Sequence, residues 1–593
     1  SLVGSEMCIR DKNMRIHNII KTVCLAGSLA LLSACEDWLE IEPKDRFGDT
    51  TVWGSEENAD MFLNDIYNQL PHLNNETQNL DQYSDNSYVG AEWMNARTTI
   101  YTGALSPTSW IPGPWDMWKW GRQNNDDAKG QYERIRSCNL FITKVTESDF
   151  SAEYKKERLA EVRFLRAWFY HYLWMAYGGV PIITEVLDNN VSTDIFYPRE
   201  TAQKTFEFID KELDEIKDDL PPRRSGSDLG RASKGAILTL KGWVELFHAS
   251  ELRNPGKDKK RWEAAAATLK DVIDLQVYHL QPTILDLWTE ATNNNDEVIF
   301  DFQMSKQNGG RREGLFGPVF VKGVQSSWGN MQPTQELVDD YCMANGLPIT
   351  DPASGYNKNN PYKNREKRFY QSILYDGSMW QGEEIITRVG VGSPNEIDTS
   401  SDSDVTNTGY YTRKTIDESV NGADNLQMSN GMANYIFFRY ADVLLMYAEA
   451  SLEAGDKPTA IEYLDMVRTR GDNMPSIGDT YPQGITENQL REIIRRDRRI
   501  ELAFEDKRWW DILRWKICDG ENGVMNKPIG GMKIEDTNGD GVWEYNYHEV
   551  GKRTFLPRMY YQPIPQYVID KNPVIREQNG GEDGWVNGQN PGY

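Results

Sequence analysis

The sequence is poor in the residues from which most catalytic and metal-binding motifs are built. Its 593 residues include only six histidines and six cysteines, and they contain no HExxH, GxSxG, GxxxxGK[ST] or CxxC pattern. These absences disfavour zinc peptidases, serine hydrolases of the nucleophile-elbow type, P-loop nucleotide hydrolases and structural zinc sites. A glycoside hydrolase stays open, because its two carboxylates are defined by their separation in space, and 90 Asp and Glu residues offer many pairs.

Positive charge is also in short supply. The chain has 65 Lys and Arg against 90 Asp and Glu, which gives a formal net charge of -25. A chain this acidic repels phosphate backbones unless a local basic patch intervenes. The arginine-rich stretch from Arg491 to Arg499 alternates with apolar helix positions, which is typical of a solvated helix face. The composition therefore argues against nucleic acid as a partner.

The N-terminal apolar run, Val23 to Leu32, is too short to cross a membrane. A spanning helix needs roughly 20 apolar residues, so a run that follows the weakly basic Met14-Arg15 predicts a signal peptide. The run ends in Leu32-Ser33-Ala34-Cys35, which resembles a bacterial lipobox and predicts a lipid on Cys35. Residues 14–34 are therefore interpreted as a lipoprotein signal peptide, and residues 1–13, which carry acidic residues unlike an export signal, as a non-native extension.

Disulfide bonds are not expected in the mature chain. Once the leader is removed and Cys35 carries lipid, only Cys138, Cys342 and Cys518 remain, and they are widely spaced and odd in number. The fold must be held together by packing and polar contacts.

What the sequence does contain is helical periodicity. Apolar residues recur at intervals of three and four residues between Asn124 and Tyr177, which predicts two helices. Gly178-Gly179-Val180-Pro181 ends the second helix. Thr486 and Gln489 form a capping box, and Ile485 and Leu490 a hydrophobic staple, at the start of another helix. The pattern also predicts helices at Thr201–Leu220, Arg231–Ser250, Trp262–Leu275, Asn434–Ala454 and Pro458–Arg470, with small residues such as Gly242 allowing close helix approach.

Between these helices the helical periodicity of apolar residues is lost. Gly-, Asn-, Ser- and Asp-rich stretches from about residue 291 to 430 predict loops and small sheets, with Val298-Ile299-Phe300 as one strand. The predicted fold is all-α dominated. Tetratricopeptide-like helix pairs form a scaffold mainly at 36–290 and 431–520, around a loop-rich insert at 291–430, and an irregular segment at 521–593 follows.

A set of short segments occurs in one order along nearly all of the mature chain, 35–593. The segments are Cys35-Glu36-Asp37-Trp38-Leu39, Tyr132-Glu133-Arg134-Ile135, Glu161 to Ala167, Gly178 to Pro181, Gly230-Arg231-Ala232, Pro333 to Val338, Arg439 to Val443, Arg508-Trp509-Trp510-Asp511 and the ending Gln589 to Tyr593. In this order they resemble the SusD/RagB family of nutrient-binding outer-membrane lipoproteins from Bacteroidetes.

This resemblance implies a function and partners that the residues alone do not supply. It implies a lipid-anchored protein on the cell surface that captures an oligosaccharide for a SusC-like TonB-dependent transporter, with no catalysis and no required cofactor. A family member serving peptide import is the alternative, and a hydrolase or an adhesive surface protein is a more distant one.

Aromatic residues outside the helices are the candidates for ligand contact. Tryptophans interleaved with Pro and Gly between residues 93 and 120 cannot all occupy helical core positions, and flat indole faces suit the apolar face of a sugar. The family places its ligand contacts in this segment and in the irregular middle. The candidates are Trp110, Trp115, Trp118, Trp328, Tyr356 and Trp380, each weighed against a role in packing.

Other aromatic and charged residues are interpreted as structural. Trp168, Trp174, Trp243, Trp509 and Trp510 have the spacing of core positions. The arginines at 163–166 and 508–514 are expected in buried ion pairs, for which Glu449, Glu501 and Asp511 are natural partners.

One segment resembles the opening of a calcium loop. Asp536, Asn538 and Asp540 are spaced like the first oxygen ligands, but position 12 is Tyr547 where the closing glutamate belongs. Two interpretations follow, a calcium site or a plain Asn-Gly or Asp-Gly hairpin turn.

Overall fold

The computed structural model describes residues 49–70, 79–109, 130–187, 195–306, 309–400 and 404–593. The chain divides into two compact units, residues 1–62 and 63–593. In the first unit, α2 (Asp49–Val52) and the start of α3 (Glu56–Tyr67) are described, and the rings of Trp53 and Phe62 lie 5.1 Å apart. Cys35 lies outside the described residues. Everything below concerns the second unit.

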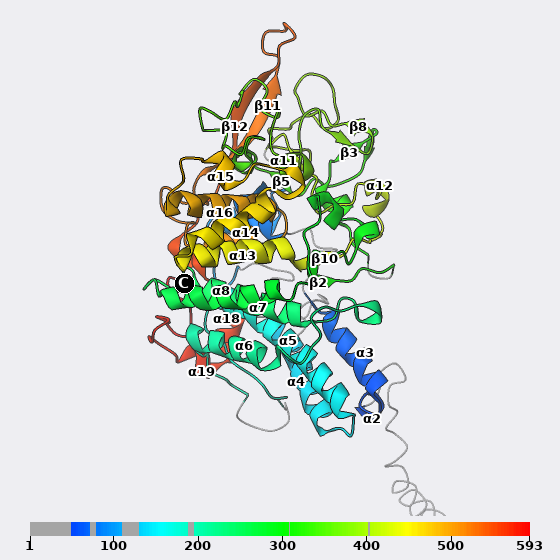
Figure 1. Cartoon of the computed structure of the whole chain (residues 1–593), viewed down its shortest axis with the longest axis vertical. Helices are drawn as coiled ribbons and strands as arrows, with labels where there is room; N and C mark the ends of the chain where they lie inside the picture. The colour runs from blue at the N-terminus through cyan, green and yellow to red at the C-terminus, as the bar shows by residue number, and fades with distance from the viewer. Residues whose placement is uncertain (1–48, 71–78, 110–129, 188–194, 307–308, 401–403) are drawn as a thin grey trace, which may run out of the picture. The chain divides into compact units, whose positions relative to one another are not determined.

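Helices in the second unit pack in pairs, some of them joined by short connections (Figure 1). The packed pairs are α4 (Gln131–Glu147) with α5 (Ala152–Tyr177), α5 with α6 (Ala202–Ile216), α7 (Lys234–Ala249) with α8 (Lys259–Asp274), α8 with α13 (Tyr440–Glu453), and α13 with α14 (Lys457–Arg468) and α16 (Glu487–Glu501). The predicted helical scaffold is confirmed, with boundaries close to those that the periodicity gave.

The predicted signals for the start and the end of helices are confirmed. Thr486 Oγ1 accepts from the Gln489 backbone N–H at 3.2 Å, and Gln489 Oε1 accepts from the Thr486 N–H at 2.9 Å. Gly178 has φ 79° directly after α5, a conformation that favours glycine. A Cβ on Gly242 would lie 2.6 Å from Leu269 Cδ2, so α7 and α8 pack closely only because position 242 is glycine.

The prediction of a helix at Asn434–Ala454 is wrong for its first residues. Residues Tyr435–Arg439 form strand β10, which pairs antiparallel with β2 (Val298–Phe302), and the helix begins only at Tyr440. The apolar run Tyr435 to Phe438 has no period that separates a buried strand from a buried helix. This small sheet packs on α5, since the Trp168 ring lies 5.0 Å from Phe300 and 5.1 Å from Phe437.

The loop-rich middle contains short elements only. Its helices are α9 (Arg312–Phe316), α10 (Gln335–Asp340), α11 (Lys367–Ser372) and α12 (Gly422–Asn425). Its two-residue strands pair antiparallel as β3 (Phe320–Val321) with β4 (Val324–Gln325), β6 (Ile373–Leu374) with β9 (Tyr411–Thr412), and β7 (Met379–Trp380) with β8 (Glu383–Glu384). Strand β5 (Gln332–Pro333) pairs with β1 (Ser87–Tyr88), which comes from the N-terminal end of the unit.

The C-terminal segment is more regular than the sequence indicates. After α17 (Arg508–Arg514), strands β11 (Pro528–Glu535) and β12 (Glu544–Lys552) form a long hairpin, followed by the short helices α18 (Gln566–Lys571) and α19 (Pro573–Arg576). Asp536 to Gly541 lie in the turn of this hairpin, where the hairpin interpretation places them, and the calcium interpretation stays a prediction. The Asp536 carboxylate accepts from the backbone N–H of Asp540 at 3.1 Å and of Gly541 at 2.9 Å.

Buried ion pairs join the helical scaffold to the loop-rich middle. One network joins five cations to five carboxylates by ion pairs, with Glu501 accepting from Arg368, Arg439 and Arg470. Its other members are Lys414, Arg468, Glu297, Glu366, Asp497 and Glu505. Burial alone would raise the pKa of Glu501, but these arginines hold that pKa well below its usual range.

The expectation of buried arginine pairs is confirmed, although the partners were only partly foreseen. Arg514 pairs with Glu449 at 2.6 Å and with Asp511 at 2.9 Å. Arg163 and Arg166 pair with Glu212, and Arg508 pairs with Asp85, so these partners lie on other elements. The expectation of a solvated face at 491–499 is wrong for two positions, because Arg498 and Arg499 are buried in ion pairs.

The expectations for the helical tryptophans and for the cysteines also hold. Trp168, Trp174, Trp243, Trp509 and Trp510 are all buried. Cys138, Cys342 and Cys518 are buried free thiols. No helix of the described chain has both the length and the apolar character to span a membrane.

Candidate functional site

The loop-rich middle contains a groove of about 420 Å³ formed by three segments that are distant in sequence. The β3–β4 hairpin supplies Lys322 and Ser326, the β7–β8 turn supplies Gln381, and the chain entering α12 supplies Glu418 and Asn421. Figure 1 shows β3, β8 and α12 on one side of the unit. The β3–β4 and β7–β8 hairpins each have a tight two-residue turn. Both turn residues have positive φ, Lys322-Gly323 in the first hairpin and Gln381-Gly382 in the second.

Hydrogen bonds between the segments fix the walls of the groove. The Gln381 backbone N–H donates to the Glu418 carboxylate at 2.9 Å, and the Gln381 side-chain amide donates to the Glu418 and Val420 carbonyls at 2.9 and 2.7 Å. Arg413 holds the other oxygen of Glu418 at 2.9 Å. The Lys322 backbone N–H donates to Glu383, which ties the two hairpins together. The groove is therefore preorganised.

Several polar groups in the groove are not used by these bonds. Within the described part of the chain, the Lys322 ammonium, the Gln381 Oε1 and the Asn421 Nδ2 have no hydrogen-bond or ion-pair partner. They offer two kinds of donor and one acceptor, the combination that sugar hydroxyls require. The groove is suited to a polar, hydroxyl-rich ligand.

Trp328 lies close to this groove along the chain, two residues after Ser326, and its side chain is 40% exposed. Its backbone N–H donates to the Gly314 carbonyl at 3.0 Å, and Asn330 N–H donates to the Leu315 carbonyl at 2.9 Å. The segment that carries the indole is thus anchored to α9 at Trp328 itself and at Asn330. Of the three middle-region candidates, Trp328 presents an accessible ring on an ordered support.

Trp380 and Tyr356 are not brought to the groove. Trp380 is 4% exposed and packs in the hydrophobic core of the loop-rich region, while its strand neighbour Met379 is 53% exposed. Successive strand residues point to opposite faces, so the short strand β7 that turns Met379 outward turns Trp380 inward. The structure thus gives Trp380 a packing role. Tyr356 is half-buried beside Arg365, whose guanidinium carbon lies 5.9 Å from the ring.

The other candidates lie outside the described residues. Trp110, Trp115 and Trp118 belong to the segment 110–129 and receive no structural account. The groove residues Lys322, Gln381, Glu418 and Asn421 were missed by the sequence reasoning. The hairpins that form the groove could have been located from two X-Gly pairs between short apolar segments, Lys322-Gly323 and Gln381-Gly382.

No metal centre accompanies the groove in the part of the chain that the structure describes. Within the described ranges, no cluster of three or more His, Cys, Asp or Glu side chains is arranged to hold a metal ion. Asp536, Asn538 and Asp540 lie in the β11–β12 turn, where Asp536 accepts two backbone N–H groups and Asp540 accepts from Val542 N–H at 2.9 Å. These carboxylates stabilise the turn.

The chain matches two family models. Residues 296–585 match the SusD family, and residues 37–241 match the family described as starch-binding, associating with outer membrane. Curated relatives include a SusD-like protein of Formosa agariphila, 25% identical over 86% of this chain and 94% of its own length. Another is a SusD-like protein of Bacteroides ovatus, 24% identical over 94% of each chain.

Solved structures agree with the family models. A SusD-like protein from Bacteroides fragilis superposes with a TM-score of 0.74 at 27% identity, covering 92% of this chain and 99% of that one. A SusD-like carbohydrate binding protein from the same species gives a TM-score of 0.72 at 26% identity, covering 88% of this chain and 99% of that one. Two family models that match successive parts of the chain, relatives along most of its length and the shared helical fold together show that this chain belongs to the SusD/RagB family.

Proposed function

We propose that this protein binds oligosaccharides at the bacterial surface, with Trp328 and the groove lined by Lys322, Ser326 and Gln381 as parts of the binding site. The observation that carries the proposal is an anchored, exposed indole two residues after Ser326, which lines a groove whose free polar groups are both donors and acceptors. A flat ring packs on the apolar face of a pyranose, and the polar groups bind hydroxyls at its edges. Membership of a family that includes a carbohydrate-binding protein of similar fold supports this assignment.

The test is glycan binding by Trp328→Ala. Burying on the order of 100 Å² of ring and sugar at about 25 cal/mol per Å² contributes about 2.5 kcal/mol before the entropic cost of association. Losing the ring should therefore weaken binding by about tenfold or more. A glycan array identifies the ligand, and calorimetry with that ligand measures both proteins.

Phe196→Ala is the matched control, because Phe196 is also 40% exposed but lies on the helical scaffold, away from the groove. We expect Phe196→Ala to bind glycan like the wild type and both variants to melt within a few degrees of it. Equal glycan affinity for Trp328→Ala and Phe196→Ala would refute the role of Trp328. Peptides retained in place of glycans would favour the peptide-import alternative.

The same proposal assigns binding without cleavage. The sequence lacks nucleophile, metal and phosphate motifs, and the groove carboxylate Glu418 is held by Arg413 and the Gln381 backbone. Chromatography of a bound oligosaccharide after prolonged incubation should return it intact. Product release that a single Asp or Glu substitution abolishes would instead identify a hydrolase.

Surface anchoring and delivery to a transporter complete the proposal. The lipobox at Cys35 and the outer-membrane description of the matching family support a lipid-anchored location, and family membership supports a SusC-like TonB-dependent partner. Cys35→Ala should give a folded protein that no longer partitions with membranes, because the lipid contributes to anchoring and not to folding. Co-purification from mild detergent tests the partner, and repeated recovery of the protein alone would count against it.

A further inference from the structure

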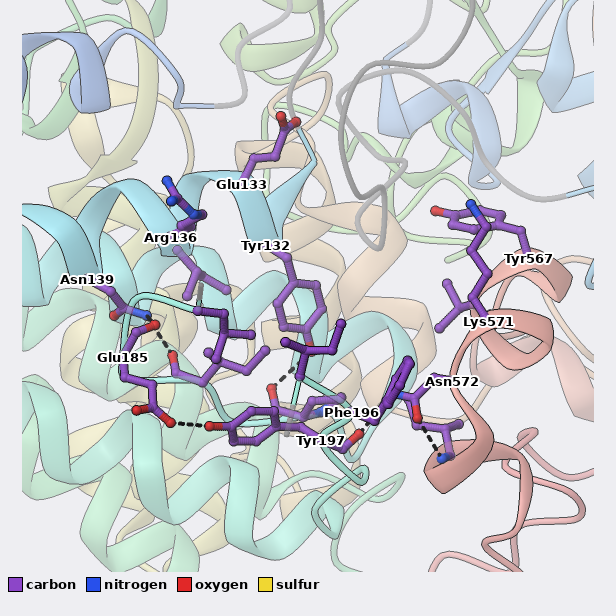
Figure 2. A pocket seen from close by; sticks show the side chains of 17 residues that line it. Tyr132, Glu133, Arg136, Asn139, Glu185, Phe196, Tyr197, Tyr567, Lys571 and Asn572 are labelled. Carbon is purple, nitrogen blue, oxygen red and sulfur yellow. Dashed lines mark hydrogen bonds between the residues drawn. The ribbon is translucent and has the colours of Figure 1, made fainter. Parts of the chain in front are cut away.

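A second cavity lies in the helical scaffold, away from the residues proposed to bind glycan. Its volume is about 430 Å³, within the usual range for small-molecule sites. Figure 2 shows its walls: Tyr132 and Arg136 on α4, Phe196 and Tyr197 on the connection before α6, and Tyr567 and Lys571 on α18. Its lining also includes Ile135, Ile183, Val568 and Ile575, so the lining is mainly aliphatic and aromatic.

Polar groups in the cavity wall are already used by the fold. Tyr132 Oη donates to the Pro181 carbonyl at 3.0 Å, and the Asn139 amide donates to the carbonyls of Ile183 and Glu185 at 3.0 and 3.1 Å. Asn572 caps α19 and donates to the Tyr197 carbonyl at 3.1 Å. A hydroxyl-rich ligand would leave its own polar groups unpaired here, which costs free energy. The cavity therefore favours a ligand with an apolar body.

The charged side chains at the cavity differ in whether they are already bonded and so in whether they can bind a ligand. Glu133 accepts from the Gly130 N–H at 3.3 Å in the cap of α4, and Glu185 accepts from the Tyr197 hydroxyl. Arg136 and Lys571 stand on different walls, are exposed, and form no ion pair with any described residue. An anionic head group can approach either cation without displacing an ion pair between described residues. Phe196 and Ile195, both exposed, add apolar surface to the cavity lining.

We propose that this cavity binds an amphipathic anion, a molecule with an apolar body and one carboxylate or sulfonate head. The apolar body packs between α4 and α18 against Phe196, and the head lies toward Arg136 or Lys571. The site is independent of the glycan groove, because none of its lining residues lines that groove.

The probe is 1-anilinonaphthalene-8-sulfonate, an aromatic sulfonate whose fluorescence rises in apolar surroundings. It is titrated into the full chain carrying Cys35→Ala, which removes the predicted lipid and the need for detergent. Decanoate, decanol and decyltrimethylammonium then compete with the bound probe. These competitors share the apolar body and differ in the charge of the head, so their ranking separates the apolar contribution from the ionic one.

We expect saturable binding of one probe per chain, displaced best by decanoate. Phe196→Ala should weaken decanoate binding by about fivefold or more, since it removes part of the apolar wall. Arg136→Ala combined with Lys571→Ala should weaken decanoate by a similar factor and leave decanol unchanged. Trp328→Ala and Lys260→Ala, which change exposed residues elsewhere, should match the unsubstituted chain.

Two results would overturn the proposal. Equal displacement by decanoate, decanol and decyltrimethylammonium would show that no anionic head is recognised. Unchanged probe affinity in both the Phe196 and the Arg136/Lys571 variants would show that the probe binds elsewhere. Neither result bears on the glycan site, because Phe196→Ala should keep glycan binding and Trp328→Ala should keep probe binding.

Discussion

Replacing Arg439 by methionine should destabilise the protein strongly, because this guanidinium is buried and fully bonded. All five of its N–H groups donate: to Glu505 twice, to Glu297, to the Glu501 carboxylate and to the Glu501 carbonyl, at 2.7 to 2.8 Å. Methionine keeps much of the side-chain volume but removes the charge and every donor. Three buried carboxylates then lose one cation each.

The expected loss is set by burial. Removing one partner of a buried, hydrogen-bonded ion pair typically costs about 3–5 kcal/mol, since the remaining charge stays desolvated. Glu501 keeps Arg368 and Arg470, and Glu505 keeps Lys414, so the network is weakened and not abolished. We therefore expect Arg439→Met to lower the free energy of unfolding by about 3–5 kcal/mol.

Urea unfolding followed by tryptophan fluorescence measures this loss. Lys204→Met is the control, because Lys204 and Glu200 form an ion pair of similar length, 2.9 Å, but are 63% and 35% exposed. Exposed pairs contribute about 0–1 kcal/mol. If Arg439→Met cost no more than Lys204→Met, the buried network would not stabilise the fold as argued. Combining Arg439→Met with Glu501→Gln should cost less than the sum of the single changes, because the two share one interaction.

Three further predictions concern pH, capping and calcium. Burial, with Asp81 close by, raises the pKa of Asp506 to about 7, so its contribution to stability is present below about pH 4 and is lost as pH rises through 7. Asp506→Asn should therefore flatten the fall in melting temperature between pH 5 and 8, and an unchanged fall would contradict this assignment. Thr486→Ala should lower the free energy of unfolding by about 0.5–2 kcal/mol by removing the cap of α16, whereas Thr184→Ala, an exposed residue outside any helix, should not. Calcium should give no saturable heat in calorimetry, since the Asp536 carboxylate already accepts two N–H groups of the turn, and heat that Asp536→Asn abolishes would show a calcium site.

Local signals in the sequence predicted the helical scaffold well. Periodicity, the Gly178-Gly179 stop and the Thr486 capping box all depend on residues within a few positions of one another, and all three are confirmed. The strand β10 was missed because four consecutive apolar residues fit a buried strand and a buried helix equally.

Long-range features could not be read in the same way. Asp85 meets Arg508 and Arg499 across more than four hundred residues, and no spacing rule connects them. The groove joins segments around 322, 381 and 418, each of which is an ordinary polar loop in isolation. The side to which Trp380 points was decided by the register of a two-residue strand, and composition carries no information about that register.

The pairing of β2 with β10 has a consequence for how this architecture can vary. Phe302 and Tyr435 are directly paired, so the chain between them leaves the scaffold and returns to it at neighbouring positions of one small sheet. A segment whose ends are already adjacent can lengthen, shorten or be exchanged at little cost in closure entropy. Under the proposed function, transplanting residues 303–434 between relatives, with the strand pair as the fixed junction, should exchange ligand preference on a constant helical frame.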